Sequence, residues 1–427
     1  MTQLSFLKFN SVSVFFSVLF LISGFYIIPF TDFSVPFVTQ IKRVFFLFFI
    51  ALLISRLNFK KISQEFPALI LVLLLIYYFG QFLFRQEYLS EYIKRIGDII
   101  FITCLGSSIL QGKKSAYILL LSKIFKPSYI FLFFLFFIFF TVFNKDFCDA
   151  FKLGFGTNRA NFQIWMSQFI FLMYLTCNAK KDEQIKSKFI WVKNFKEIFL
   201  VSPIIVLLTW FGLRTGLIIS LMVILYFSSK DGALKFFKVG LVLFSIIFIA
   251  HILSPVKDRP LFRQLNISQN DLSISASKNT TLFGNNYTPA KKDFFFQFLD
   301  DLSSQRLQTI FAGFRTISQE NFFFGQGFGN VHIKLSGGNS LDIHNVYLQV
   351  LTELGFVGFV LFMCLLFYPF YLVYIKKRKS NETTPNEVFI CLVFMTVGLL
   401  HPELLIFQLS TCILFWVCYF EIIRLKK

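Results

Sequence analysis

Apolar stretches of about the length that crosses a bilayer recur along the whole chain, except between residues 254 and 343. A membrane-spanning helix needs roughly 20 mainly apolar residues. Hydrophobic residues make up 56% of the 427 positions and charged residues only 15%, well below the share in soluble proteins. We therefore expect an all-α integral membrane protein with about twelve transmembrane helices and a large periplasmic loop that contains amphipathic helices.

The expected spans fall into two groups, with nine in residues 1–253 and three in residues 344–427, on either side of the loop at 254–343. They are Val12–Ile28, Ile41–Leu57, Pro67–Phe84, Ile96–Leu110, Ser128–Phe143, Asn161–Cys177, Ile198–Leu213, Thr215–Phe227, Lys235–Leu253, Val346–Tyr374, Val388–Leu400 and Leu404–Ile423. The first is longer than the core of a signal peptide, so we interpret it as a span. Six of the seven cysteines lie in or beside these stretches and are interpreted as buried structural thiols: Cys104, Cys177, Cys364, Cys391, Cys412 and Cys418.

The net charge of +19 is interpreted as a topology signal and not as nucleic-acid binding. Lys and Arg collect in cytoplasmic segments of membrane proteins, and long loops follow this rule only weakly. With a cytoplasmic N-terminus, 24 of the 42 basic residues fall on inner segments and nine on the long loop. Both termini are thus expected in the cytoplasm and the loop in the periplasm.

The long loop divides into a polar first part and a patterned second part. Asn266–Lys292 is rich in Asn, Ser and Thr and is expected to be a flexible spacer. From Leu302 an amphipathic helix is predicted, with an apolar stripe of Leu307, Ile310, Phe311 and Phe314. The glycine-rich turn Gly325–Asn330 follows, and no βαβ unit surrounds it, so a dinucleotide site is not predicted.

His344 opens the tenth expected span. On a helix, His344, Leu348, Leu351, Gly355 and Gly358 share one face, and the two glycines would let a neighbouring helix approach. A neutral histidine can accept a proton from a hydroxyl group. The alternative is an interfacial histidine that makes a structural hydrogen bond.

Two arginines and one glutamate complete the set of candidates. Arg214, between the seventh and eighth spans, either binds an anion or extends its charge to the interface. Arg306, on the loop helix, either holds phosphate oxygens or is a solvated charge. Together with His344 they would suit a lipid diphosphate and an incoming hydroxyl. Glu353 either handles protons or makes an interhelical hydrogen bond, and no acidic cluster for a metal-assisted diphosphate site is present.

Three runs resemble the signature of the O-antigen ligase and O-antigen polymerase superfamily: Gly325–Asn330, His344–Leu348 and Glu353–Gly358. The resemblance covers about Ser304–Phe362, and the expected topology matches the whole chain. It implies a glycosyltransferase of the GT-C type in the bacterial inner membrane, working at the periplasmic face with neither metal nor other cofactor. Asn158–Asn161 is similar to a motif in an earlier outer loop of the family.

The resemblance implies roles for individual residues. His344 would be the general base or acceptor-positioning group, and Arg214 and Arg306 would hold the diphosphate. Possible support comes from three neighbours of His344, namely Asn345, Tyr347 and Glu353. Two positions depart from the family pattern: Ile310 stands where tryptophan is frequent, and Leu213 where serine is common.

The implied donor is a glycan on undecaprenyl diphosphate, and the implied acceptor is a saccharide hydroxyl on either a lipid-linked repeat or lipid A-core. The first acceptor would make the protein a polymerase, which we favour slightly, and the second a ligase. A transporter or flippase for lipid-linked sugars is a third interpretation. It predicts charges inside several spans and paired internal repeats, whereas the charges here gather at the outer ends of the spans.

Overall fold

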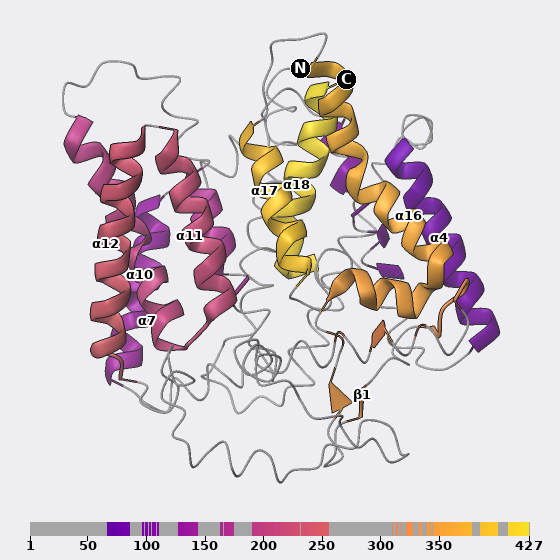
Figure 1. Cartoon of the computed structure of the whole chain (residues 1–427), viewed down its shortest axis with the longest axis horizontal. Coiled ribbons are helices and arrows are strands. Elements are labelled where there is room, and N and C mark those ends of the chain that lie inside the picture. Colours follow the sequence, from indigo (N-terminus) through magenta and orange to yellow (C-terminus); the bar gives the residue numbers. More distant parts are fainter. Residues whose placement is uncertain are drawn as a thin grey trace, which may run out of the picture.

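The computed structural model of the chain is a bundle of helices (Figure 1). It describes residues 66–85, most of 96–110, 127–143, 163–174 except 165, 190–230, 232–255, scattered residues of 310–345, and 346–377, 385–399 and 409–426. Within these residues the strands are two residues long: β1 (Ile333–Lys334) pairs antiparallel with β2 (Ser340–Leu341). The all-helical prediction is thus confirmed for the described part, apart from this small ladder.

Each long helix coincides with one of the expected apolar spans. The helices are α4 (Phe66–Arg85), α7 (Pro127–Phe143), α10 (Ile190–Trp210), α11 (Arg214–Ser229), α12 (Ala233–Ile252), α16 (Val346–Lys377), α17 (Pro385–Gly398) and α18 (Leu409–Lys426). By length and composition, three stretches of the described residues could cross a membrane: Phe66–Leu83, Ala233–Ile252 and Val346–Ile375. The total of twelve spans remains a prediction, and the first two spans lie outside the described residues.

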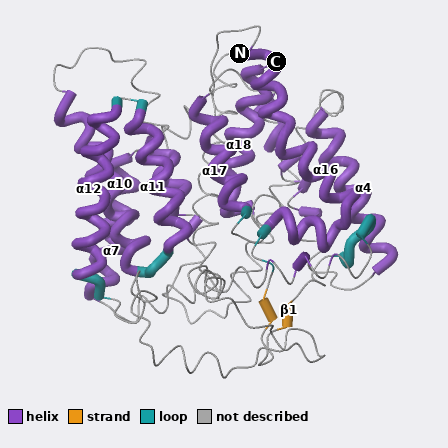
Figure 2. Tube along the Cα trace, in the orientation of Figure 1, coloured by secondary structure: helices purple, strands orange, loops and turns teal. Residues whose placement is uncertain are grey.

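The helices form two groups, with α7, α10, α11 and α12 in one and α4, α16, α17 and α18 in the other (Figures 1 and 2). Directed hydrogen bonds tie helices within each group. The indole N–H of Trp210 donates to the carbonyl of Ala250 over 2.9 Å, which joins the ends of α10 and α12. The Tyr419 hydroxyl donates to the carbonyl of Leu365 over 2.6 Å, which joins α18 to α16.

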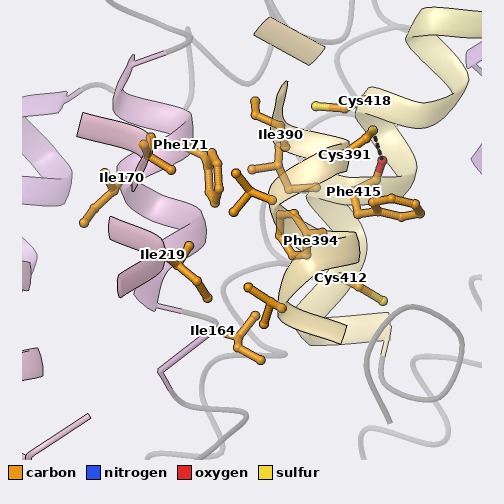
Figure 3. Close-up of a cluster of buried hydrophobic side chains, with 14 of the residues drawn as sticks. Ile164, Ile170, Phe171, Ile219, Ile390, Cys391, Phe394, Cys412, Phe415 and Cys418 are labelled. Carbon is orange, nitrogen blue, oxygen red and sulfur yellow. Dashed lines mark hydrogen bonds between the residues drawn. The ribbon is translucent and has the colours of Figure 1, made fainter. Parts of the chain in front are cut away.

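Apolar side chains join the two groups (Figure 3). The ring of Tyr226 of α11 stacks on Phe389 of α17 with centroids 3.6 Å apart, and the ring of Phe171, from helical residues 166–174, stacks on Phe394 of α17 with centroids 5.5 Å apart. Cys391, Cys412 and Cys418 are buried in or beside this contact, as predicted. The prediction is wrong for Cys364, which is exposed because it shares the outward face of α16 with exposed residues one turn before and after it, Val360 and Phe367.

One side of the bundle carries the helix ends next to which the predicted site residues lie. The starts of α11 and α16 lie on the side where β1 and β2 are found, and the C-terminal end of α18 lies on the other side (Figure 1). Two contacts agree with this order: Tyr347, at the start of α16, bonds Met395 near the end of α17, and the ring of Phe66, at the start of α4, meets Tyr368 in the second half of α16. We call the side with β1 and β2 the loop side.

Candidate functional site

Helix α16 is broken at Gly355, nine residues after it begins. Gly355 has φ 66° and ψ −172°, a conformation that is essentially restricted to glycine. The first half, Val346–Leu354, therefore runs in a different direction from the second (Figure 1). The expectation that Gly355 and Gly358 continue the face of Leu348 is wrong, because the helical periodicity ends between these positions.

The break leaves carbonyls of the first half without their usual partners, and a loop segment replaces them. In an unbroken helix the Thr352 and Glu353 carbonyls would accept from amides four residues later. Here Thr352 accepts from the N–H of Gln326, and Glu353 from the N–H of Gly327, each over 2.9 Å. Both donors belong to the glycine-rich turn that was predicted from Gly325 onward.

The same segment satisfies the amides that open the second half. The N–H of Phe356 donates to the carbonyl of Phe322 over 2.8 Å, and the N–H of Val357 donates to that of Phe323 over 3.2 Å. Buried backbone groups must be paired. The turn Phe322–Gly327, which we call the bridging turn, thus takes the place of the missing helical turn on both sides of the break.

Two glycines make this close approach possible. A β-carbon on Gly325 would lie 2.4 Å from the Glu353 carbonyl oxygen and from the Gly355 nitrogen, and one on Gly355 would lie 2.4 Å from the Gly325 nitrogen. Gly325 also has a positive φ of 70°. The sequence correctly indicated that something approaches Gly355 closely, but the neighbour is the bridging turn and not another helix.

Helix α4 supplies side chains that complete the junction. The Tyr77 hydroxyl donates to the carbonyl of Leu354 over 2.6 Å. The Gln81 amide donates to the Phe324 carbonyl over 2.6 Å and lies 3.4 Å from the Glu353 carbonyl. Three segments far apart in the sequence therefore meet at the break. The sequence analysis missed Tyr77 and Gln81, although a glutamine inside an apolar stretch was a usable signal.

The start of α16 is fixed on both sides of His344, which itself lies outside the described residues. Asn345 caps the helix, because its side-chain oxygen accepts from the N–H of Leu348 over 3.0 Å. Ile343 is fully buried. The Tyr347 hydroxyl donates to the carbonyl of Met395 over 2.6 Å. Asn345 and Tyr347, expected as supporting residues, thus hold the helix start in place.

Glu353 is buried at the end of the first half of α16. Its side chain is 3% exposed, and its Oε1 accepts from the Gln349 amide one turn earlier over 3.1 Å. Thr352, beside it, donates its hydroxyl proton to the carbonyls of Leu348 and Gln349. The bond from Gln349 lies within the helix, whereas the sequence analysis had offered an interhelical bond.

The predicted loop helix packs on the start of α16, but with a different face. Residues 310, 313, 314 and 317 are helical. Ile310 and Ile317 pack against Ile343 and Leu348, and a β-carbon on Gly313 would lie 2.8 Å from Leu348. Phe314, assigned to the apolar stripe, is 57% exposed. The packed face therefore differs from the predicted stripe, because Gly313, which has no side chain, lies against the start of α16. Leu307 and Phe311 lie outside the described residues.

Arg214 is the first residue of α11 and is half-buried. The turn before it contains Gly212 with φ 63°, which reverses the chain between α10 and α11. The first amides of a helix lack partners within it. Gln163 supplies one, because its side-chain oxygen accepts from the N–H of Gly216 over 3.1 Å. Gln163 is a second residue that the sequence analysis missed.

The structure thus places four of the six predicted site residues: Arg214, Asn345, Tyr347 and Glu353. Arg214 opens α11, Asn345 directly precedes α16, and Tyr347 and Glu353 lie in the first half of α16; both of these helix starts are on the loop side (Figure 1). Arg306 and His344 lie outside the described residues. Among the residues that are described, no group of three or more His, Cys, Asp or Glu side chains could hold a metal ion.

One of three comparisons with known proteins gives a match. A family model described as O-antigen ligase matches residues 185–363. This range begins just before α10 and ends within the second half of α16. No curated protein and no solved structure matches the chain.

Proposed function

Because residues 185–363 match the O-antigen ligase family model, which supports the O-antigen ligase and polymerase superfamily, we propose that the chain is a glycosyltransferase of surface-polysaccharide assembly. It moves a saccharide from undecaprenyl diphosphate to an acceptor sugar hydroxyl at the periplasmic face of the inner membrane. The family match carries the proposal, and it includes Arg214, Arg306 and His344.

The proposed reaction is a substitution at the anomeric carbon of the donor sugar. The acceptor oxygen forms the new glycosidic bond while the bond from the anomeric carbon to the diphosphate oxygen breaks. His344 accepts the hydroxyl proton, and undecaprenyl diphosphate leaves with the bonding electrons. Base catalysis of this kind is worth about 10²–10⁴-fold in rate.

Arg214 is proposed to bind the diphosphate. The amino end of a helix carries partial positive charge, so the guanidinium and the helix dipole of α11 attract an anion at the same place. The hydrogen bond from Gly216 to Gln163 and the bond from the Ser167 hydroxyl to the Gly216 carbonyl, over 3.1 Å, hold this end of α11 in position. A fixed cation costs little reorganisation when the leaving group develops charge.

Arg306 and His344 are proposed to face the same substrate from the loop and from α16. Arg306 precedes Ile310 by one helical turn in the sequence, and Ile310 packs against the start of α16. His344 stands between the buried Ile343 and the capping Asn345. These neighbours support a fixed position for the proposed base.

One observation bears on the transporter alternative. The transporter interpretation predicts charged residues along the spans, whereas the polar contacts of α4, α11 and α16 described above gather at their loop-side ends. Polymerase and ligase differ only in the acceptor. We keep the slight preference for the polymerase. A deletion strain that makes single-repeat lipopolysaccharide would support the polymerase, and one that accumulates lipid-linked polymer would support the ligase.

The proposal is tested by complementing a deletion strain with His344→Ala, Arg214→Ala or Arg306→Ala and resolving the surface polysaccharide on gels. Each variant is expected to lose most of the product at wild-type protein level. Lys238→Ala on α12 is the control. It removes one positive charge at the end of the bundle opposite Arg214, and it is expected to leave the amount of polysaccharide unchanged. Wild-type polysaccharide from all three site variants would reject the site.

Arg214→Lys separates charge from geometry. Lysine keeps the positive charge but lacks the two-pronged guanidinium that matches a diphosphate. An activity between those of the wild type and Arg214→Ala is expected in a membrane assay with purified donor. Equal activity of Arg214→Lys and Arg214→Ala would mean that the positive charge itself contributes nothing.

A further inference from the structure

The bridging turn carries three consecutive exposed aromatic side chains. Phe322, Phe323 and Phe324 are 47%, 60% and 62% exposed. Phe322 packs its ring on Phe356 with centroids 5.4 Å apart, and on Phe323 in an edge-on contact. Exposed apolar surface of this kind marks an interaction site.

The exposure of α16 changes abruptly at the break. From Val346 to Gly355 every residue is buried or half-buried, and Phe356 and Val357 directly after it are exposed. The candidate span Val346–Ile375 has 30 residues, or about 45 Å of helix, which exceeds the ~30 Å hydrocarbon core. The second half alone, Phe356–Lys377, is long enough to cross.

Helix α4 presents the same kind of surface next to the turn. Its exposed apolar residues recur at helical spacing and end with Phe79 at 53% and Leu83 at 56%. Gln81, on the opposite and buried face of α4, donates to the carbonyl of Phe324. The exposed phenylalanines therefore lie beside α4, and the ring contact of Phe322 with Phe356 joins them to the outward face of α16.

The backbone carbonyls of the bridging turn would keep their hydrogen bonds if the turn entered the membrane. Non-helical backbone is tolerated at membrane depth only where its polar groups are satisfied by protein. The carbonyls of Phe322 and Phe323 accept from the amides of α16, and that of Phe324 accepts from Gln81. These three carbonyls therefore have partners within the protein.

We propose that Phe322, Phe323 and Phe324 insert into the phospholipid of the outer leaflet, so that the membrane surface lies at Gly355 and the first half of α16 lies above the hydrocarbon core. The turn then anchors the large loop at a fixed height over the bilayer. This goes beyond the proposed transferase activity and does not depend on it.

The test places the photo-crosslinking residue p-benzoylphenylalanine at Phe323 of the full chain in nanodiscs of phosphatidylethanolamine and phosphatidylglycerol. Phe79 is the positive control on the outward face of α4, and Phe362, fully buried in α16, is the negative control. Mass spectrometry after illumination is expected to give a phospholipid adduct at position 323 with a yield of the same order as at position 79, and none at position 362.

A second site keeps the test decisive if the first variant fails to fold. Phe324 has the same exposure and is substituted in parallel. Phospholipid adducts at either position, in a protein that elutes as a single species, support the anchor. Adducts at position 79 with none at 323 or 324, or adducts from 323 and 324 to protein alone, overturn it.

Discussion

The start of α11 and the break in α16 solve opposite problems with the same kind of side chain. At the start of α11 a backbone N–H needs an acceptor, and the oxygen of Gln163 provides it. At the break in α16 carbonyls need donors, and the nitrogen of Gln81 provides one. A glutamine amide has both functions. The comparison teaches that polar residues inside these apolar helices are placed to satisfy backbone at irregular points.

The largest effect is expected from Gly355→Ala, which breaks the α16 half of this comparison. Alanine cannot adopt the Gly355 conformation without strain, and its β-carbon would lie 2.4 Å from the backbone of the bridging turn. A loss of about 2–5 kcal/mol of stability is expected. The melting temperature of the detergent-solubilised protein should fall. It is measured from maleimide labelling of the buried Cys391, Cys412 and Cys418 as the temperature rises.

Gly80→Ala is the matched control for that substitution. Gly80 is on α4, and a β-carbon there would have nothing within 4 Å. Alanine favours a helix over glycine, so stability should be unchanged or slightly raised. An equal loss from Gly80→Ala and Gly355→Ala would contradict the close contact described for the bridging turn.

The next effect sharpens the contrast between the two glutamines. Gln81→Glu replaces the donor with an acceptor that faces the carbonyls of Phe324 and Glu353 at a position only 8% exposed. A loss of about 2–4 kcal/mol is expected. The readout is the same labelling melt.

Gln163→Glu is the partner experiment to Gln81→Glu. It keeps an acceptor for the N–H of Gly216 and places a negative charge at the amino end of α11, which is favourable. Gln163 is 4% exposed, so burial of the charge opposes this gain, and a loss smaller than that of Gln81→Glu is expected. If Gln163→Glu cost more than Gln81→Glu, the assignment of acceptor and donor roles to the two amides would be reversed.

Tyr77→Phe removes a hydroxyl that lies 2.6 Å from the Leu354 carbonyl and 3.2 Å from the Phe324 carbonyl. The Leu354 carbonyl would lose the hydroxyl that replaces its helical partner, while the ring keeps its packing. A loss of about 1–2 kcal/mol is expected. Tyr129→Phe on α7, a 59% exposed tyrosine, is a control that should leave the melting temperature unchanged within error.

A smaller effect than that of Tyr77→Phe is expected from Asn345→Ala at the start of α16. Loss of the cap should cost about 1 kcal/mol, and Asn345→Ser should restore most of it. If capping positions the proposed base, the fall in transferase rate of Asn345→Ala, expressed as a free energy, should exceed its loss in free energy of unfolding. Equal stability of the Ala and Ser variants would show that the cap contributes nothing.

Hydropathy predicted the helices well because a long apolar helix needs little else to be recognised. Leu71 and Leu74 of α4, or Phe415 and Trp416 of α18, are buried as their patterns suggest. The break in α16 was not predicted, because Gly355 stands inside a predicted span and Pro369, a stronger helix breaker, lies later in the same helix. What decides the break is a contact with residues about 30 positions away, which periodicity cannot register.

The candidate site was predicted by residue type more than by arrangement. The resemblance to the family singled out Arg214 and the segment around His344, and the structure places Arg214 at a helix start and Asn345 at a cap. Tyr77 and Gln81 escaped notice because their partners are backbone carbonyls, which carry no signature in a sequence.

The bonds of α4 to the break also constrain the order of biosynthesis. Tyr77 and Leu354 are 277 positions apart, and Gln81 and Phe324 are 243 positions apart. A ribosome delivers α4 to the membrane long before either acceptor exists. Tyr77 and Gln81 therefore lack these partners in the nascent protein until the last third of the chain has been synthesised. The junction between α4 and α16 forms late in folding.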